Sequence, residues 1–137
     1  MILTDTTFLI DCLRKKADVQ AIIDNYPDEI LYTTEINVFE MYLGLYSSKF
    51  LKSKKELFEQ RKKRLEDLLT KFQVLSFARK EAIEAAKILG KLSIEGQLID
   101  FRDGMIGGIA RINGISTILT KNVEHFKRIE SLNVISY

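Results

Sequence analysis

Apolar and polar positions alternate in blocks along the chain, and the first blocks predict a strand followed at once by a helix. An apolar run, Met1–Leu3, stops at four polar residues, and apolar residues at helical spacing follow from Phe8 to Leu13. This pattern predicts a buried strand, a tight break and a helix. Asp5 would then lie at the carboxyl end of the strand, which is the edge where open α/β sheets bind ligands.

The later blocks repeat this alternation. Short β-type runs occupy 30–33, 73–75, 115–119 and 133–135. Helical spacing occupies 34–46, 49–72, 79–95, 101–113 and 123–129, and a helical face also continues over 19–23. Strands that alternate with helices favour a parallel sheet covered on both faces. We therefore expect an α/β fold in which residues 1–137 form a single domain, with a central parallel sheet flanked by helices.

Composition narrows the class of protein without naming a function. The hydrophobic fraction of 46% predicts a globular chain, and the net charge of +2 is too small to imply nucleic-acid binding by itself. The single cysteine, Cys12, cannot form an internal disulfide, which fits a reducing cytosol. No apolar run approaches the roughly 20 residues of a membrane span. No signal peptide is recognisable at the amino terminus. We expect a cytoplasmic protein that does not enter a membrane.

Three acids stand at the edges of predicted elements. Asp5 ends the first strand, Glu40 lies in the helix after the second strand, and Asp103 opens the helix before the fourth strand. Carboxylates gathered at one sheet edge could hold one or two Mg²⁺ or Mn²⁺ ions, because hard cations take oxygen ligands. Such an ion makes a bound water acidic enough to attack phosphorus in line. His125 and Cys12 form no cluster, so zinc is not expected.

Each acid also has a purely structural explanation. Asp5 could be only the N-cap of its helix. Asp103 could favour a helix amino end through the helix dipole. Glu40 could face solvent or pair with a lysine. Their joint placement on one predicted edge favours a shared site.

Four segments together resemble the PIN domain, in particular the VapC-type toxins of prokaryotic toxin–antitoxin pairs. They are LTDTTFLID (3–11), TEINVFEMYLG (34–44), GQLIDFRDGMI (96–106) and TKNVEHF (120–126). The resemblance implies a metal-dependent endoribonuclease with a parallel sheet, usually dimeric and held inactive by a cognate antitoxin. It also implies that Asp5 and Asp103 are the main ligands of Mg²⁺ or Mn²⁺ and that Glu40 is the third acid.

The chain departs from the family pattern in two places. Many members have an acid near the fourth segment where this chain has Asn122, a neutral accessory ligand that would hold a second metal more weakly. Members often have alanines where this chain has Gly107 and Gly108. Glycine inside a helix is about 1 kcal/mol less favourable than alanine. Close approach of that helix to the sheet would explain the glycine pair.

Neighbouring polar residues could assist the acids. Thr6 and Thr120 could hydrogen-bond a ligand carboxylate or a bound water, and Thr120 could equally cap the next helix. Asp100 is a rival for Asp103, although spacing from the preceding glycine favours Asp103. We expect a surface or capping role for His125.

Two further features bear on partners. The basic run Lys49–Arg64 contains eight basic and two acidic residues. It fits an RNA phosphate track, and it fits equally the solvated face of a long helix. The aromatic residues Tyr42, Tyr46, Phe50 and Phe58 are spaced for packing, in the core or between subunits. The cluster from Tyr42 to Phe50 could also form an apolar groove for an antitoxin helix.

Several functions remain open from the sequence. The first is a Mg²⁺- or Mn²⁺-dependent endoribonuclease with an RNA substrate, a cognate antitoxin and a homodimeric assembly. The second is a PIN-like module that binds RNA or protein without cutting, which Asn122 supports. A third is another α/β phosphate enzyme. No Gly-rich segment ends in Lys-Ser or Lys-Thr, which excludes a P-loop enzyme. A haloacid-dehalogenase-like phosphatase would need a second aspartate two residues after Asp5, where this chain has Thr7. The same metal site would serve a DNA backbone.

Overall fold

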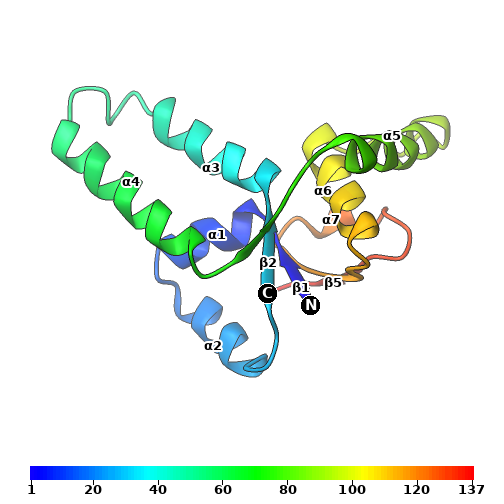
Figure 1. Cartoon of the computed structure of the whole chain (residues 1–137), viewed down its shortest axis with the longest axis horizontal. Coiled ribbons are helices and arrows are strands. Elements are labelled where there is room, and N and C mark those ends of the chain that lie inside the picture. Colours follow the sequence, from blue (N-terminus) through cyan, green and yellow to red (C-terminus); the bar gives the residue numbers. More distant parts are fainter.

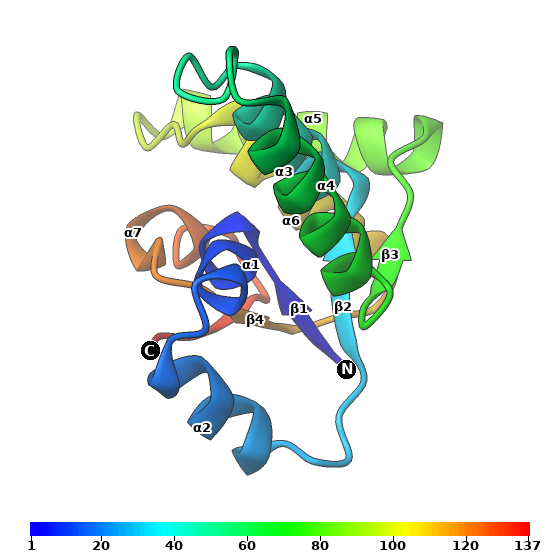
Figure 2. The ribbon, with the colours of Figure 1, turned by 90° about the vertical axis from the view of Figure 1, so that its left-hand side faces the viewer.

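Five short strands form a parallel sheet in the order β3-β2-β1-β4-β5 (Figures 1 and 2). The computed structural model describes all residues, 1–137. The strands are β1 (Ile2–Thr4), β2 (Leu31–Thr34), β3 (Gln73–Leu75), β4 (Thr117–Leu119) and β5 (Asn133–Ile135). The central strand β1 is buried along its length, as the apolar opening of the chain predicts. The predicted parallel sheet flanked by helices is confirmed.

Helices connect the strands and cover both faces of the sheet. They are α1 (Thr6–Leu13), α2 (Ala17–Asn25), α3 (Glu35–Tyr46), α4 (Lys55–Leu69), α5 (Arg79–Ile94), α6 (Phe101–Ile112) and α7 (Val123–Phe126). Figure 1 shows α1 to α4 on one side of the strands and α5 to α7 on the other. No helix combines the length and the apolarity needed to span a membrane.

The two faces of the sheet bury separate cores because successive side chains of a strand point in opposite directions. Leu3 and Ile118 pack into the core that includes α5 and α6. Their neighbours Ile2 and Leu119 pack into the core that includes α1 and α4. All four side chains are nearly or fully buried, so a shift of strand register by one residue would exchange the two cores.

Helices α5 and α6 pack closely because α6 presents glycine at their contact. A Cβ at Gly108 would lie 2.7 Å from the backbone nitrogen of Ala85 and 2.8 Å from the carbonyl oxygen of Glu81. A Cβ at Gly107 would lie 2.7 Å from the side chain of Ile129. The expectation that these glycines allow approach to the sheet is therefore wrong. Gly108 lies against the backbone of α5, and Gly107 lies against Ile129 in the segment after α7.

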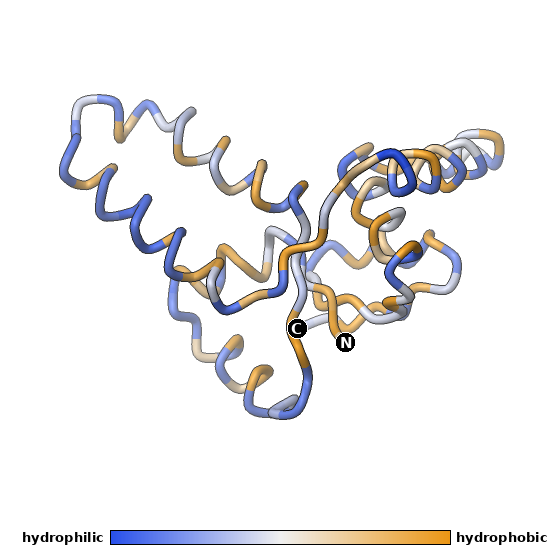
Figure 3. Tube along the Cα trace, in the orientation of Figure 1, coloured by the Kyte–Doolittle hydropathy of each residue, from blue (hydrophilic) through white to orange (hydrophobic).

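The helix predicted over 49–72 is shorter than expected. It begins only at Lys55, and residues 47–54 form turns. Leu51 is buried within those turns, and its backbone N–H donates a hydrogen bond to the Ser48 hydroxyl at 3.3 Å. Leu51 is thus buried although its segment lies outside the helix. The first three lysines of the basic run lie in these turns, and the rest of the run follows on α4, which Figure 3 shows as largely hydrophilic.

Candidate active site

Asp5 lies where β1 ends and α1 begins. Its Oδ1 accepts hydrogen bonds from the Phe8 backbone N–H at 3.3 Å and from the Thr7 hydroxyl at 2.7 Å. Its Oδ2 accepts one from the Thr120 hydroxyl at 2.5 Å. Asp5 is thus the N-cap of α1, and Thr120, which follows β4, holds its second oxygen. The capping role considered for Asp5 is therefore confirmed. The same carboxylate lies at the carboxyl edge of the sheet.

Glu40 reaches the same edge from α3. Thr34 ends β2 and begins α3 through a capping box, in which its hydroxyl accepts from the Asn37 N–H and its own N–H donates to Asn37 Oδ1, both at 3.2 Å. The Thr6 hydroxyl donates to Glu40 Oε1 at 3.0 Å and accepts from Asn37 Nδ2 at 3.1 Å. Because Thr6 is the first residue of α1, this chain of hydrogen bonds fixes Glu40 beside Asp5.

Asp103 lies in the first turn of α6, and the segment after β4 contacts it. Asn122 Nδ2 donates to Asp103 Oδ2 at 2.8 Å. The same oxygen lies 2.6 Å from Nδ1 of His125 in α7. Asp100 instead caps α6, because its Oδ1 accepts from the Arg102 backbone N–H at 2.9 Å. The two rival aspartates therefore have different surroundings.

These side chains line one open cavity of about 270 Å³, called here the carboxylate cavity. Its lining is Asp5, Thr6, Thr7, Asn37, Glu40, Asp100, Arg102, Asp103, Ile106, Asn122 and His125. The structure thus brings together the three acids chosen from the sequence, with Thr6 and Asn122 beside them. Thr120 is fully buried behind Asp5.

The carboxylate cavity disfavours negative charge on Asp5, Glu40 and Asp103. Burial raises the pKa of Asp5, and it outweighs the hydrogen bonds from Thr120 and Thr7 that lower it. Burial also raises the pKa of Glu40 and of Asp103 against similar opposing hydrogen bonds. The charge of Asp103 adds to the effect at Asp5 and at Glu40. A cation bound among these carboxylates would reverse the penalty on their ionised forms.

The donor set fits a hard divalent cation. Carboxylates, an amide oxygen and hydroxyls are the ligands that Mg²⁺ and Mn²⁺ accept. As the side chains stand, no three of the Asp, Glu, His and Cys side chains converge on a single point.

Several cavity residues were not predicted to be there, among them His125 and Arg102. His125 was expected to have a surface or capping role, but its ring contacts Asp103. Its sequence signal is its position three residues after Asn122, one helical turn further on. Arg102 was not singled out, and its guanidinium lies 3.6 Å from Glu40 Oε2. Nothing local signals this contact, since it depends on how α3 and α6 pack.

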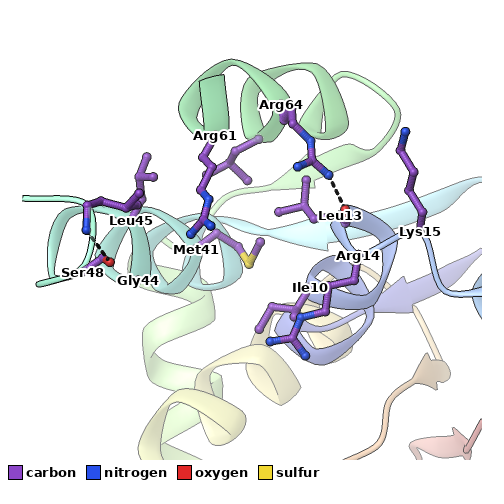
Figure 4. Close-up of a pocket in the computed structure, with 12 residues that line it drawn as sticks. Ile10, Leu13, Arg14, Lys15, Met41, Gly44, Leu45, Ser48, Arg61 and Arg64 are labelled. Carbon is purple, nitrogen blue, oxygen red and sulfur yellow. Dashed lines mark hydrogen bonds between the residues drawn. The ribbon is translucent and has the colours of Figure 1, made fainter. Parts of the chain in front are cut away.

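A larger cavity lies between α1, α3 and α4 (Figure 4), with a volume of about 830 Å³. Its lining includes Ile10, Leu13, Met41, Leu45, Leu51 and Leu65, with Arg14, Lys15, Arg61 and Arg64. The aromatic residues expected to form an apolar groove do not line this cavity, and Tyr46 and Phe58 instead line a second cavity of about 580 Å³. Tyr42 stacks on Tyr46 at 6.3 Å between ring centroids, and Tyr46 lies 5.6 Å from Phe58. They pack α3 against α4, while Met41 and Leu45 on another face of α3 line the cavity.

The sheet order and the acids at its carboxyl edge define an α/β fold with an acidic cavity at that edge, and comparison with known families identifies the family. Residues 2–132 match the PIN domain family. The chain belongs to that family, which confirms the recognition made from the four segments. PIN domains are generally nucleases that use divalent metal ions. A search of curated proteins gives no significant match.

Solved structures of similar fold cover almost the whole chain. VapBC2 from Rickettsia felis, bound to a DNA fragment from its promoter, has a TM-score of 0.85 at 21% identity, covering 100% of this chain and 99% of that chain. FitAcB from Neisseria gonorrhoeae has a TM-score of 0.83 at 28% identity, covering 98% and 96%. VapBC-1 from nontypeable Haemophilus influenzae has a TM-score of 0.80 at 23% identity, covering 99% of this chain and 98% of that chain. The fold likeness agrees with the VapC-type resemblance of the sequence.

Proposed function

We propose that this protein is a Mg²⁺- or Mn²⁺-dependent endoribonuclease, the toxin of a VapBC-type toxin–antitoxin pair. One observation carries the proposal. Asp5, Glu40 and Asp103 come from distant parts of a PIN-family chain and line one cavity at the carboxyl edge of the sheet. Burial raises the pKa of all three, so a bound cation would stabilise the ionised forms that the chemistry needs.

The three acids and their hydrogen-bond partners each have a definable task in this proposal. Asp5, Glu40 and Asp103 hold the cation. A divalent cation there would supply an acidified water and would neutralise charge on the phosphodiester. Thr120 orients the Asp5 carboxylate and Thr6 orients that of Glu40. Partners of this kind fix ligand geometry and tune the ligands they contact.

Asn122 and His125 orient Asp103 in the same way, since both contact its Oδ2. Asn122 stands where many family members carry an acid. Its amide nitrogen donates to Asp103, which makes it a partner of the ligand. We therefore propose one principal metal position, with Asn122 as an accessory residue.

We propose a cognate antitoxin as the protein partner. The cavity between α1, α3 and α4 supports this, because it combines apolar side chains with Arg14, Lys15, Arg61 and Arg64 and has no acidic lining residue. An amphipathic helix with acidic flanks would match both features. Several of the similar solved structures are VapBC complexes.

We propose that the chain itself forms a homodimer. Phe39 and Leu43 lie one turn apart on α3 and are 56% and 45% exposed. Phe101, at the start of α6, is 63% exposed. A second copy that covered these side chains would remove apolar surface from water. Light scattering of the purified chain should give twice the monomer mass, and a monomer mass at micromolar concentration would contradict the dimer.

The test of the nuclease is cleavage of a labelled structured RNA by antitoxin-free protein. We expect cutting with Mn²⁺ and none with EDTA. Asp5→Asn and Asp103→Asn should each abolish cutting. Asn at position 5 still caps α1 through its side-chain oxygen, so circular dichroism should be unchanged. The matched control is Asp67→Asn, an exposed α4 carboxylate paired only with Lys63, which should cut normally.

Cutting that persists in EDTA or in Asp5→Asn would contradict the assignment. No cutting, together with no Mn²⁺ binding by calorimetry, would favour the second function considered from the sequence. That function is a PIN-like module that binds RNA or protein without cleaving it.

A further inference from the structure

Arg102 is the one arginine or lysine among the residues that line the carboxylate cavity. Its side chain is 47% exposed and lies between Asp100 and Glu40. The cavity otherwise presents four carboxylates, from Asp5, Glu40, Asp100 and Asp103. A phosphodiester entering such a cavity meets repulsion from these like charges. Arg102 is therefore the protein group placed to attract it.

One side of the guanidinium is held in place. Arg102 Nε lies 3.2 Å from Asp100 Oδ1, and Nη2 lies 3.4 Å from Asp100 Oδ2. The backbone N–H of Arg102 donates to the same Asp100 Oδ1 at 2.9 Å. These hydrogen bonds to Asp100 orient the plane of the guanidinium before any ligand binds. A pre-oriented fork loses less side-chain entropy when it forms another contact.

On the other side of the guanidinium, Nη1 makes no hydrogen bond within the protein. Arg102 Nη1 lies 3.6 Å from Glu40 Oε2, which is longer than a normal hydrogen bond. Glu40 has its own hydrogen bond from Thr6 through the other carboxylate oxygen. The N–H groups of Nη1 therefore remain able to donate to an incoming anion at the cavity.

We propose that Arg102 is a substrate-positioning residue that binds a non-bridging phosphate oxygen of the RNA backbone at the carboxylate cavity. The inference rests on the proposed nuclease function, because it places the substrate at the same cavity. It adds how an acidic cavity accepts an anionic chain. Arginine suits this task because its fork matches phosphate oxygens.

The first test is steady-state cleavage of a labelled RNA in Mn²⁺ by Arg102→Gln and Arg102→Lys. We expect Arg102→Gln to raise KM about 10-fold, the size typical of one charge-assisted hydrogen bond, with kcat within about threefold. Lysine keeps the charge but loses the fork, so Arg102→Lys should recover part of the KM. The matched control is Arg111→Gln on the same helix. Arg111 pairs with Glu84 outside the cavity, and its variant should keep the wild-type KM.

The second test measures RNA binding without cleavage, by fluorescence anisotropy of a labelled oligonucleotide in EDTA. Loss of one phosphate contact should lower the slope of log affinity against log salt by about 0.7 for a single strand. We expect that decrease in Arg102→Gln and not in Arg111→Gln. Calorimetry should show that Arg102→Gln still binds Mn²⁺.

A purely structural role for Arg102 makes a different prediction. Asp100→Asn breaks the pair with Arg102 while keeping a side-chain oxygen to cap α6. If Arg102 acted only by holding that helix end, Asp100→Asn would reproduce the loss seen in Arg102→Gln, and that result would overturn the proposal. We expect Asp100→Asn to weaken RNA binding less than Arg102→Gln does, because removal of a negative charge offsets the loss of the pre-oriented fork.

The remaining outcomes separate the two proposals. Wild-type protein that cuts RNA, with an unchanged KM and salt slope in Arg102→Gln, would refute the role of Arg102 alone. Wild-type protein that neither cuts nor binds RNA would refute the nuclease, and the role of Arg102 with it.

Discussion

Replacing Gly108 with alanine tests the close packing of α5 on α6. The new Cβ would lie 2.7 Å from the Ala85 nitrogen and 2.8 Å from the Glu81 carbonyl oxygen. Ordinary contacts begin near 3.4 Å, so the atoms overlap by more than half an ångström. Both contacts are backbone atoms of α5, which cannot rotate away as a side chain can. The two helices must therefore separate.

The expected loss of stability follows from this overlap. Overpacking a buried position typically destabilises by about 1–3 kcal/mol. Contact with rigid backbone places Gly108→Ala at the upper end of that range. The better helix propensity of alanine offsets up to about 1 kcal/mol. We expect a net loss of about 2 kcal/mol, which for a domain of this length lowers Tm by about 6 °C.

The matched control is Gly90→Ala on α5, because nothing lies within 4 Å of a Cβ there. Gly90 is helical and exposed, so alanine should stabilise by about 0.5–1 kcal/mol. Thermal and urea unfolding of both variants, followed by circular dichroism, measures the difference. RNA cleavage should fall in Gly108→Ala as well, because α6 carries Asp103. A Gly108→Ala protein as stable as the wild type would refute the described packing.

Two predictions concern pH and charge. Burial raises the pKa of Asp103, so the folded state disfavours its charge above the unfolded pKa and gains stability as the pH falls. Asp103→Asn should therefore raise Tm at pH 7 in EDTA and abolish any stabilisation by Mn²⁺, and a lower Tm would contradict this. Burial alone would raise the pKa of Asp11, but hydrogen bonds from Lys121 and Lys16 lower it overall. Its stabilisation is present above the unfolded pKa and is lost as the pH falls through the folded pKa, so Asp11→Asn should lose about 1–3 kcal/mol at pH 7 and much less near pH 3. Equal losses in urea unfolding at both pH values would disprove the ion-pair explanation.

Local features of the chain were predictable from its sequence. Asp5 and Thr34 follow apolar strands and begin helices, and both roles depend on residues within three positions. The strand and helix order follows from apolar spacing, and so does the placement of Glu40 and Asp103 near one edge. These signals depend on residues that are close in the sequence. Both the fold class and the candidate acids could therefore be predicted from the sequence.

Contacts between distant segments were not predictable. The ring of His125 meets Asp103 from 22 positions away, and that meeting depends on how β4 joins the sheet. Helix α4 begins late, after turns in which Leu51 is buried, and no local pattern reveals that burial. Gly108 was noticed as unusual, but its neighbour on α5 could be identified only once the helices were placed.

The double role of Asp5 limits what substitution screens can reveal about this protein. A library selected only for folding would still restrict position 5 to residues that cap α1, because the Phe8 N–H needs an acceptor. Enrichment of aspartate there would reflect stability as well as chemistry. Aspartate and asparagine both cap the helix but differ in charge. Only a comparison of these two residues at position 5 therefore separates the effect on folding from the effect on activity.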